Sequence, residues 1–198
     1  MNETIFKGVF TAGLIIGSVI RSVYGKAYRR GYDRKEKSGR RKENPLVYIF
    51  MALWGIAQLI ALVYVFSGLL GFADYRLPDP AGWCGVCIYA GAVWLLWRSH
   101  VDLGGNWSPL LEIQKRHELV TKGVYRRIRH PMYAAHWLWV IAQPLLLQNW
   151  IAGLGGLISL GPVYFFRVGR EETMLTERFG DAYRDYKSRT GRILPRRK

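Results

Sequence analysis

Five long apolar segments alternate with shorter polar segments along this chain. They cover residues 5–23, 45–72, 80–97, 131–147 and 150–168. A helix needs about 20 residues to cross the hydrocarbon core of a bilayer, with about 17 as the lower limit. The second segment is long enough to tilt across the bilayer, whereas the fourth only reaches the lower limit. The pattern predicts an all-α integral membrane protein with about five transmembrane helices.

The last two apolar segments are separated only by Gln148 and Asn149. Such a short connection predicts that the two helices form a tight hairpin. Pro131 stands at the start of the fourth segment. Proline fits the first turn of a helix because its missing N–H is not needed there. We therefore expect the fourth helix to begin at Pro131.

The composition also favours a membrane protein over a soluble one. Hydrophobic residues make up 50% of the 198, yet the formal net charge is +15. A basic charge alone could indicate nucleic-acid binding, but here the apolar residues form long blocks. Tryptophan and tyrosine crowd the ends of these blocks, as aromatic residues do at membrane interfaces. We therefore expect membrane lipids, and no nucleic acid, as partners.

Basic residues are unevenly distributed between the apolar segments. Lysine and arginine are dense in segments 26–42 and 98–130 and in the tail, whereas segment 74–79 holds one arginine and two aspartates. Cytoplasmic loops carry an excess of lysine and arginine. With five spans, this predicts an N-terminus outside the cell and a C-terminus in the cytoplasm. We expect segment 26–42 to lie at the surface of an anionic lipid leaflet.

Cys84 and Cys87 have the C-x-x-C spacing of some metal and redox sites. They stand inside an apolar segment without charged neighbours in the sequence, and a reactive thiolate needs stabilisation by positive charge. We therefore interpret them as small packing residues. His100 and His136 form no recognisable metal-ligand pattern with the other histidines, so we expect no metal.

The polar stretch 117–133 carries a stronger sign of a functional site. It ends at a predicted helix start, which presents backbone N–H groups and a positive dipole end that can bind a carboxylate or phosphate. A basic loop before an apolar helix is also typical of any cytoplasmic membrane boundary. The concentration of polar side chains favours a site. These side chains are His117, Glu118, Tyr125, His130 and Tyr133.

Arg167 and Glu171, at the end of the last apolar segment, are four residues apart and share one face of a helix. They could form a simple salt bridge at a helix end, or Arg167 could extend along the helix toward the membrane interface. An ionisable pair at membrane depth is costly without a function. We therefore favour a site wall, which the hairpin would bring beside His130.

Together these stretches form the motifs of a known family. They are His-Glu-Leu-Val at 117–120, Thr-Lys-Gly-Val-Tyr at 121–125, Arg-His-Pro-Met-Tyr at 129–133, and a tail with Arg167, Glu171, Glu172, Phe179, Gly180, Tyr183 and Tyr186. With them the chain resembles the isoprenylcysteine carboxyl methyltransferases, in particular their short five-span prokaryotic members. The resemblance covers about the C-terminal half, from near Leu103 onward. It implies an enzyme of a prokaryotic cell membrane.

The resemblance implies S-adenosylmethionine as methyl donor and a lipophilic carboxylate, isoprenylated cysteine or a similar group, as acceptor. It assigns substrate contact to Arg167. It assigns contact with the cofactor to Gln114, His117, Glu118, Leu119, Val120, Tyr125, His130, Pro131, Met132, Tyr133 and Glu171. Glu112 is the alternative to Gln114, because the loop length differs from the family there.

The resemblance also implies a division of the chain into a membrane-spanning part with three helices, residues 1–102, and a catalytic part, residues 103–198. The second part would hold a cytoplasmic cofactor-binding loop, the hairpin and a C-terminal helix. An acceptor carboxylate is ionised at neutral pH, so it needs orientation rather than a general base. We expect Arg167 to orient it through its planar guanidinium group, while Glu171 positions the cationic cofactor and supports Arg167.

Three other functions fit parts of the same pattern. A phospholipid N-methyltransferase would use Glu171 as a base, because an amine must lose a proton before it is methylated. A membrane sterol or enone reductase would bind a nicotinamide cofactor, but such enzymes need more spans than this chain provides. A non-catalytic membrane scaffold would bind no adenosyl cofactor.

Overall fold

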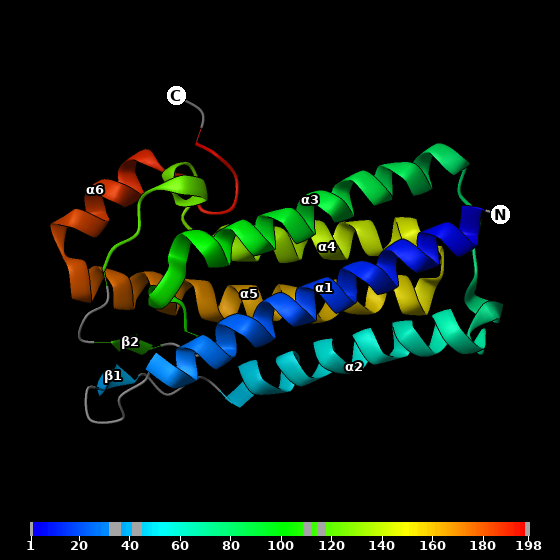
Figure 1. The fold of residues 1–198 in the computed structure, drawn as a ribbon, viewed down its shortest axis with the longest axis horizontal. Coiled ribbons are helices and arrows are strands. Elements are labelled where there is room, and N and C mark those ends of the chain that lie inside the picture. Colours follow the sequence, from blue (N-terminus) through cyan, green and yellow to red (C-terminus); the bar gives the residue numbers. More distant parts are fainter. Residues whose placement is uncertain (1, 32–36, 41–44, 109–111, 115–117, 197–198) are drawn as a thin grey trace.

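The computed structural model describes residues 2–31, 37–40, 45–108, 112–114 and 118–196. Five long helices form an elongated bundle, and a short sixth helix lies at the end opposite the N-terminus (Figure 1). The helices are α1 (Asn2–Gly31), α2 (Pro45–Ser67), α3 (Asp79–Leu103), α4 (Pro131–Leu147), α5 (Trp150–Phe179) and α6 (Asp181–Arg189). The prediction of an all-α fold is therefore confirmed.

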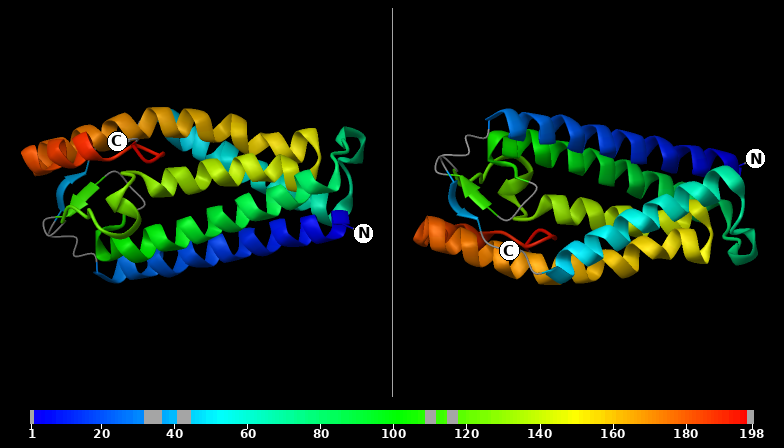
Figure 2. Two further views of the ribbon diagram at one scale, coloured as in Figure 1. Left: turned by 90° about the horizontal axis from the view of Figure 1, so that it is seen from above. Right: turned by 90° about the horizontal axis from the view of Figure 1, so that it is seen from below.

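Shorter elements connect the helices. The described strands β1 (Lys37–Arg40) and β2 (Glu112–Gln114) form one antiparallel pair, in which Lys37 lies opposite Gln114. The part of the chain that the structure describes also contains the short 3₁₀-helices η2 (Gly71–Ala73), η3 (Gly104–Asn106) and η4 (Gly123–Arg126). The strand pair and η4 lie at the same end of the bundle as α6 (Figures 1 and 2).

Four of the described helices, α1, α2, α3 and α5, are long and apolar enough to cross a membrane. The helix expected at the lower limit, α4, has 17 residues, and at 1.5 Å per residue it is about 25 Å long. It packs against α1, α3 and α5, while α2 packs against α5. The five expected helices are thus all present. Of these, α4 is the helix most enclosed by its neighbours.

The apolar segments predict which parts of the chain form long helices, but they do not predict where these helices end. The last apolar segment was expected to end at residue 168, but α5 continues to Phe179 and stops where Gly180 adopts a positive φ of 54°. Charged residues do not interrupt the helix, because its backbone hydrogen bonds persist where the chain leaves the apolar layer. The second segment ends earlier than expected, at Ser67, since Gly68 has a φ of 67°.

The interpretation of Cys84 and Cys87 as packing residues is wrong, because both side chains are exposed. The buried face of α3 instead includes Gly82, Gly85 and Tyr89. A Cβ atom at Gly85 would lie 2.8 Å from the Cβ of Leu145, so glycine lets α3 approach α4 closely. The two thiols therefore stand on the outer surface of the bundle.

The predicted hairpin between α4 and α5 is confirmed, and the Asn149 side chain holds its turn together. Its oxygen accepts hydrogen bonds from the backbone N–H groups of Ile151 (3.0 Å) and Ala152 (2.9 Å) and so caps α5. Its amide nitrogen donates to Leu70 O and to Asp74 Oδ1, each at 2.7 Å. Asn149 is fully buried, so both ends of its amide depend on these partners.

Replacement of this asparagine provides a test of the hairpin. Asn149→Ala removes the cap of α5 and leaves buried polar groups without partners, so it should lower the free energy of unfolding by about 2 kcal/mol. The measurement is the unfolding of purified protein in detergent. Asn2→Ala is the matched control, because Asn2 donates to Asp79 at an exposed position and its loss should have little effect. Equal effects of the two substitutions would show that Asn149 does not hold the hairpin.

Candidate functional site

A cavity of about 190 Å³ lies at the end of the bundle that carries α6. Its described lining comes from α1, α3, α4, α5 and α6, and from the loop between α3 and α4. The structure brings ten of the predicted site residues to this cavity. They are Glu118, Leu119, Val120, Tyr125, His130, Pro131, Met132, Tyr133, Arg167 and Glu171.

Two predicted residues are not placed in the cavity. His117 lies outside the described residues. Gln114 and its alternative Glu112 are described through the backbone of β2, where Gln114 pairs with Lys37 and Glu112 with Arg40. Their role toward a cofactor stays a prediction.

Local backbone geometry explains how the loop reaches the cavity. Gly123 has a φ of 59°, and a Cβ atom there would lie 2.1 Å from Asp102 Oδ2. Only glycine fits this combination of a left-handed conformation and close contact. Asp102 Oδ2 then accepts a hydrogen bond from the backbone N–H of Val124 at 2.9 Å. The loop is therefore fixed to the end of α3 just before Tyr125.

Tyr125 and Tyr186 connect this loop to α6. The Tyr125 hydroxyl donates to Ser99 O at 3.3 Å, and the Tyr186 hydroxyl donates to Tyr125 O at 2.6 Å. Burial, together with the negative charge of Glu171, raises the pKa of Tyr125 well above its ordinary value. The Tyr125 hydroxyl thus remains a hydrogen-bond donor at physiological pH.

Pro131 occupies the first turn of α4, as predicted. The start of α4 faces Glu171 of α5. Tyr133 donates to Glu171 Oε2 at 3.2 Å, and His130 Nδ1 lies 3.6 Å from Glu171 Oε1. Arg167 stands one turn earlier on α5 and lines the same cavity. The hairpin therefore places both members of the pair on the cavity wall, as expected from their spacing.

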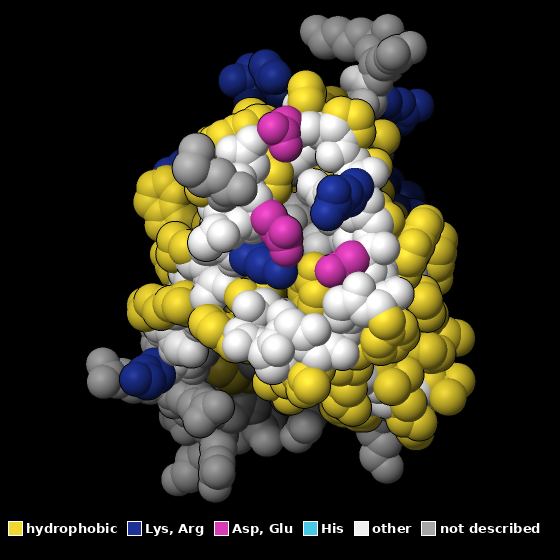
Figure 3. Space-filling view, turned by 90° about the vertical axis from the view of Figure 1, so that its right-hand side faces the viewer, with side chains coloured by type: hydrophobic (Ala, Val, Ile, Leu, Met, Phe, Trp, Pro, Cys, Tyr) yellow, Lys and Arg dark blue, Asp and Glu magenta, His cyan; other side chains and the backbone are white. Residues whose placement is uncertain are grey.

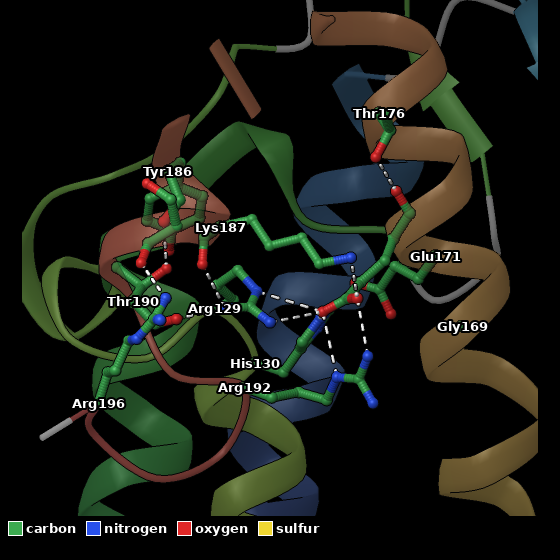
Figure 4. A network of polar contacts seen from close by, with 12 residues as sticks. Arg129, His130, Gly169, Glu171, Thr176, Tyr186, Lys187, Thr190, Arg192 and Arg196 are labelled. Atoms are coloured by element: carbon green, nitrogen blue, oxygen red, sulfur yellow. Dashed lines mark hydrogen bonds and ion pairs between the residues drawn. The ribbon is translucent and has the colours of Figure 1, made fainter. Parts of the chain in front are cut away.

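The neighbouring carboxylate, Glu172, is the centre of a larger ion network. Figure 4 shows the side chains of Arg129, Lys187 and Arg192 that converge there. Its side chain is only 5% exposed. Arg129 approaches Glu172 Oε1 at 3.0 Å, while Arg192 and Lys187 approach Oε2 at 2.9 and 3.2 Å. His130 Nε2 lies 3.4 Å from the same carboxylate. One buried anion thus joins α5, the loop before α4, α6 and the chain beyond α6.

The chain beyond α6 completes the wall behind His130. Residues 190–192, which we call the C-terminal strap, run beside the loop before α4. The His130 N–H donates to Arg192 O and the Arg129 N–H to Gly191 O, each at 2.9 Å, while the Gly191 N–H donates to Arg127 O at 3.2 Å. These backbone hydrogen bonds fix the residue that immediately precedes α4.

His130 lies between two carboxylates, because its Nδ1 faces Glu171 and its Nε2 faces Glu172. Burial of the imidazole lowers its pKa, but the two carboxylates outweigh burial and raise the pKa above the ordinary value. A protonated imidazole can donate to both carboxylates at once. The start of α4 is therefore electrostatically matched to two consecutive glutamates of α5.

Comparison with known proteins shows which family has a similar sequence. The profile of the isoprenylcysteine carboxyl methyltransferase (ICMT) family matches residues 83–177. The central part of the chain thus matches this family. Among ICMT relatives, a Tribolium castaneum protein-S-isoprenylcysteine O-methyltransferase is 30% identical over 150 residues, which are 75% of this chain and 51% of that protein. The Dictyostelium discoideum enzyme of the same name is 33% identical over 94 residues, 46% of this chain and 40% of its own length.

A solved structure shares the fold. The eukaryotic intramembrane Ras methyltransferase ICMT matches with a TM-score of 0.54 and 24% identity, over 78% of this chain and 54% of that chain. Together with the apolar helices, the match establishes an integral membrane protein. The chain spans about half or less of the length of these relatives.

Several cavity residues were not among the predicted site residues, and they come mainly from outside the ICMT motifs. Arg21 from α1 and His136 from α4 line the cavity, as do His100 and the segment from Asn106 to Ser108. Arg21 offered one signal, since an arginine inside an apolar segment is a functional candidate by default. His100 and His136 offer no such signal, because they form no metal-ligand pattern in the sequence. Among the described residues, no three His, Cys, Asp or Glu side chains form a metal-ligand group.

The network around Glu172 can be tested by stability measurements. Glu172→Ala leaves Arg129 buried without its anion, so it should lower the free energy of unfolding by about 3 kcal/mol. Asp181→Ala is the control, because it removes an ion pair with Arg184 whose two side chains are 91% and 64% exposed. That loss should be below about 1 kcal/mol. Equal losses in detergent unfolding would mean that Glu172 does not anchor the site.

Proposed function

We propose that the protein is an S-adenosylmethionine-dependent carboxyl methyltransferase of the membrane. Its acceptor would be the carboxylate of an isoprenylated cysteine or a similar lipophilic molecule. One observation carries the proposal: a single cavity gathers the ICMT motif residues from the loop, from the start of α4 and from α5. The relatives named above are protein-S-isoprenylcysteine O-methyltransferases.

The charged and apolar side chains that line the cavity support the proposed cofactor. The Glu171 carboxylate would face the cationic part of S-adenosylmethionine, and the first N–H groups of α4 suit its carboxylate. Met174, Leu175 and Phe179 add an apolar wall for the rest of the molecule. When bound, S-adenosylmethionine supplies the methyl group. We assign its contacts to the predicted cofactor residues, with His117 and Gln114 from the loop included.

The protein's own contribution to the reaction would be orientation. A carboxylate acceptor is already ionised and needs no base, so its oxygen must be desolvated and held in line. Arg167 offers a planar, two-pronged donor for this task. Correct placement of two reactants is worth several kcal/mol of the barrier, about 7–11 in favourable cases. Glu171 and Arg167 are therefore the proposed catalytic residues.

An apolar groove between α1 and α2 supports a lipophilic acceptor. It has a volume of about 740 Å³ and is lined by Leu14, Val19, Leu59, Leu62 and Phe66, among others. Both helices are candidate membrane spans, so a lipid chain could reach this groove from within the bilayer. The proposed acceptor would then enter sideways, whereas the cofactor would enter from water.

We further propose that the cavity faces the cytoplasm of a prokaryotic cell and that the N-terminus lies outside. Figure 3 looks onto the N-terminal end, where acidic side chains lie beside lysine and arginine on a largely neutral and hydrophobic surface. The described residues at the other end include a basic cluster of Arg129, Arg184, Lys187, Arg192 and Arg196. Cytoplasmic surfaces carry the greater share of lysine and arginine.

Substitutions of the two catalytic candidates should fail in different ways. Arg167→Lys keeps the charge but loses the two-pronged donor, so turnover should fall at least about tenfold with near-normal cofactor affinity. Glu171→Gln removes the negative charge beside the cofactor, so cofactor affinity should fall as well. The measurements are methyl transfer to a farnesylated cysteine analogue and calorimetry with S-adenosylmethionine, its demethylated product and NADPH.

The matched controls for this experiment are Arg178→Lys and Glu177→Gln, which change exposed residues on the same helix. Both should retain turnover and cofactor affinity. Wild-type turnover in Arg167→Lys and Glu171→Gln would show that the pair is structural. Transfer to a phospholipid amine, or binding of NADPH alone, would replace the proposed function with an amine methyltransferase or a reductase.

The orientation has its own test. With Cys84 and Cys87 replaced by serine, single cysteines at Asp74 and Ser188 should react with membrane-impermeant reagents from opposite sides of sealed membranes. The Asp74 position should react from outside, and the Ser188 position only after the inner face is made accessible. Reaction of both positions from the same side would refute the orientation.

A further inference from the structure

Arg21, on the first helix, lies in the cavity far in sequence from every ICMT motif. It lines the cavity together with Arg167, and its Nη1 lies 3.2 Å from His136 Nε2. Two arginines, one from α1 and one from α5, thus line the same cavity.

The contacts of His136 determine how Arg21 is held. His136 Nδ1 lies 2.6 Å from Met132 O. A carbonyl oxygen only accepts hydrogen bonds, so Nδ1 carries the proton. A guanidinium only donates, so Nε2 must be the acceptor for Arg21. His136 is therefore a neutral imidazole of one tautomer, and the Trp54 ring lies against it with a centroid separation of 5.1 Å. Its role is to orient Arg21.

The charges of the cavity leave Arg21 without a carboxylate. Arg129, the third arginine of the lining, is paired with Glu172. Glu171 contacts His130 and Tyr133. Within the described ranges, no aspartate or glutamate forms an ion pair with Arg21. A partly buried cation in a membrane segment is costly unless an anion accompanies it. The arrangement therefore calls for an anionic ligand.

Depth separates this position from the proposed cofactor contacts. His136 follows Pro131 by five residues, which is about 8 Å along the axis of α4. Arg167 precedes Glu171 by four residues, about 6 Å along α5. Because α4 and α5 run in opposite directions in the hairpin, both displacements lead away from the α6 end and into the bundle. Arg21, His136 and Arg167 thus form a deeper level, and His130, Tyr133 and Glu171 a shallower one.

We propose that Arg21, oriented by His136, is a second substrate-binding residue that holds the acceptor carboxylate together with Arg167. The inference rests on the proposed function, since it assigns the anion to the acceptor. An acceptor anchored in the bilayer by its lipid chain reaches the deeper level first. Two guanidinium groups hold both oxygens of a carboxylate, which selects an acid over an amide or an ester.

The test compares an acid with its neutral ester. Binding of N-acetyl-S-farnesylcysteine, of its methyl ester and of S-adenosylhomocysteine is measured on purified protein in detergent. In Arg21→Met, affinity for the acid should fall at least about tenfold, while affinities for the ester and for S-adenosylhomocysteine stay unchanged. Arg21→Lys keeps the charge without the two-pronged geometry and should show an intermediate loss. His136→Phe should also reduce the preference for acid over ester.

Arg178→Met is the charge-matched control, because it removes an exposed arginine of α5 that does not line the cavity. It should keep the preference of the wild type. Unchanged S-adenosylhomocysteine affinity in Arg21→Met and Arg21→Lys shows that each variant is folded. If S-adenosylhomocysteine affinity falls in Arg21→Lys while the preference for the acid persists, Arg21 binds the cofactor and the inference is overturned.

The remaining outcomes separate the inference from the proposed function. A wild-type protein that methylates the acid, with an unchanged preference in Arg21→Met, overturns only the inference. A wild-type protein that neither binds nor methylates the acid overturns the proposed function and the inference together.

Discussion

A single buried carboxylate holds together the parts of the chain that form the candidate site. Glu172 pairs with Arg129 before α4, with Lys187 at the end of α6, and with Arg192 in the C-terminal strap. Each cation alone is a long, mobile side chain. Convergence on one acceptor that is 5% exposed fixes three segments at once. The position of His130, and with it the start of α4, depends on this convergence.

The arrangement of charge along α4 and α5 suits a reaction between a water-soluble and a lipid-soluble partner. Near the α6 end the cavity presents the Glu171 carboxylate and helix N–H groups, with Arg129 paired to Glu172, and the deeper level carries the guanidinium groups of Arg21 and Arg167. Opposite charges placed one helical turn apart therefore give the cavity a polarity along the bundle axis. A cationic methyl donor would enter the cavity from water at the α6 end. An anionic acceptor would enter from the bilayer at the deeper level.

Much of the architecture could be predicted from the sequence, because a run of consecutive apolar residues is enough to indicate a membrane helix. The apolar segments indicated the helices, Gln148 and Asn149 indicated the hairpin, and Pro131 indicated the start of α4. The same reasoning brought Arg167 and Glu171 to one wall, since a helix and a short turn leave few alternatives. It did not reach Arg21, whose partner His136 is 115 residues away. It also did not reach the central role of Glu172, whose partners Arg129 and Arg192 are 43 and 20 residues away. Only tertiary packing brings these residues together.

The C-terminal strap has a consequence for how relatives of this chain are compared. Its hydrogen bonds with residues 127–130 use main-chain atoms, so these bonds do not themselves require the side chain of Thr190 or Arg192, although Arg192 also pairs with Glu172. Gly191 is the exception, because a Cβ atom there would lie 1.7 Å from Leu194 O. The family profile ends at residue 177, short of the strap. Searches guided by side-chain identity will therefore place the edge of this site too early, and a glycine at the right distance after the paired glutamates is the better marker.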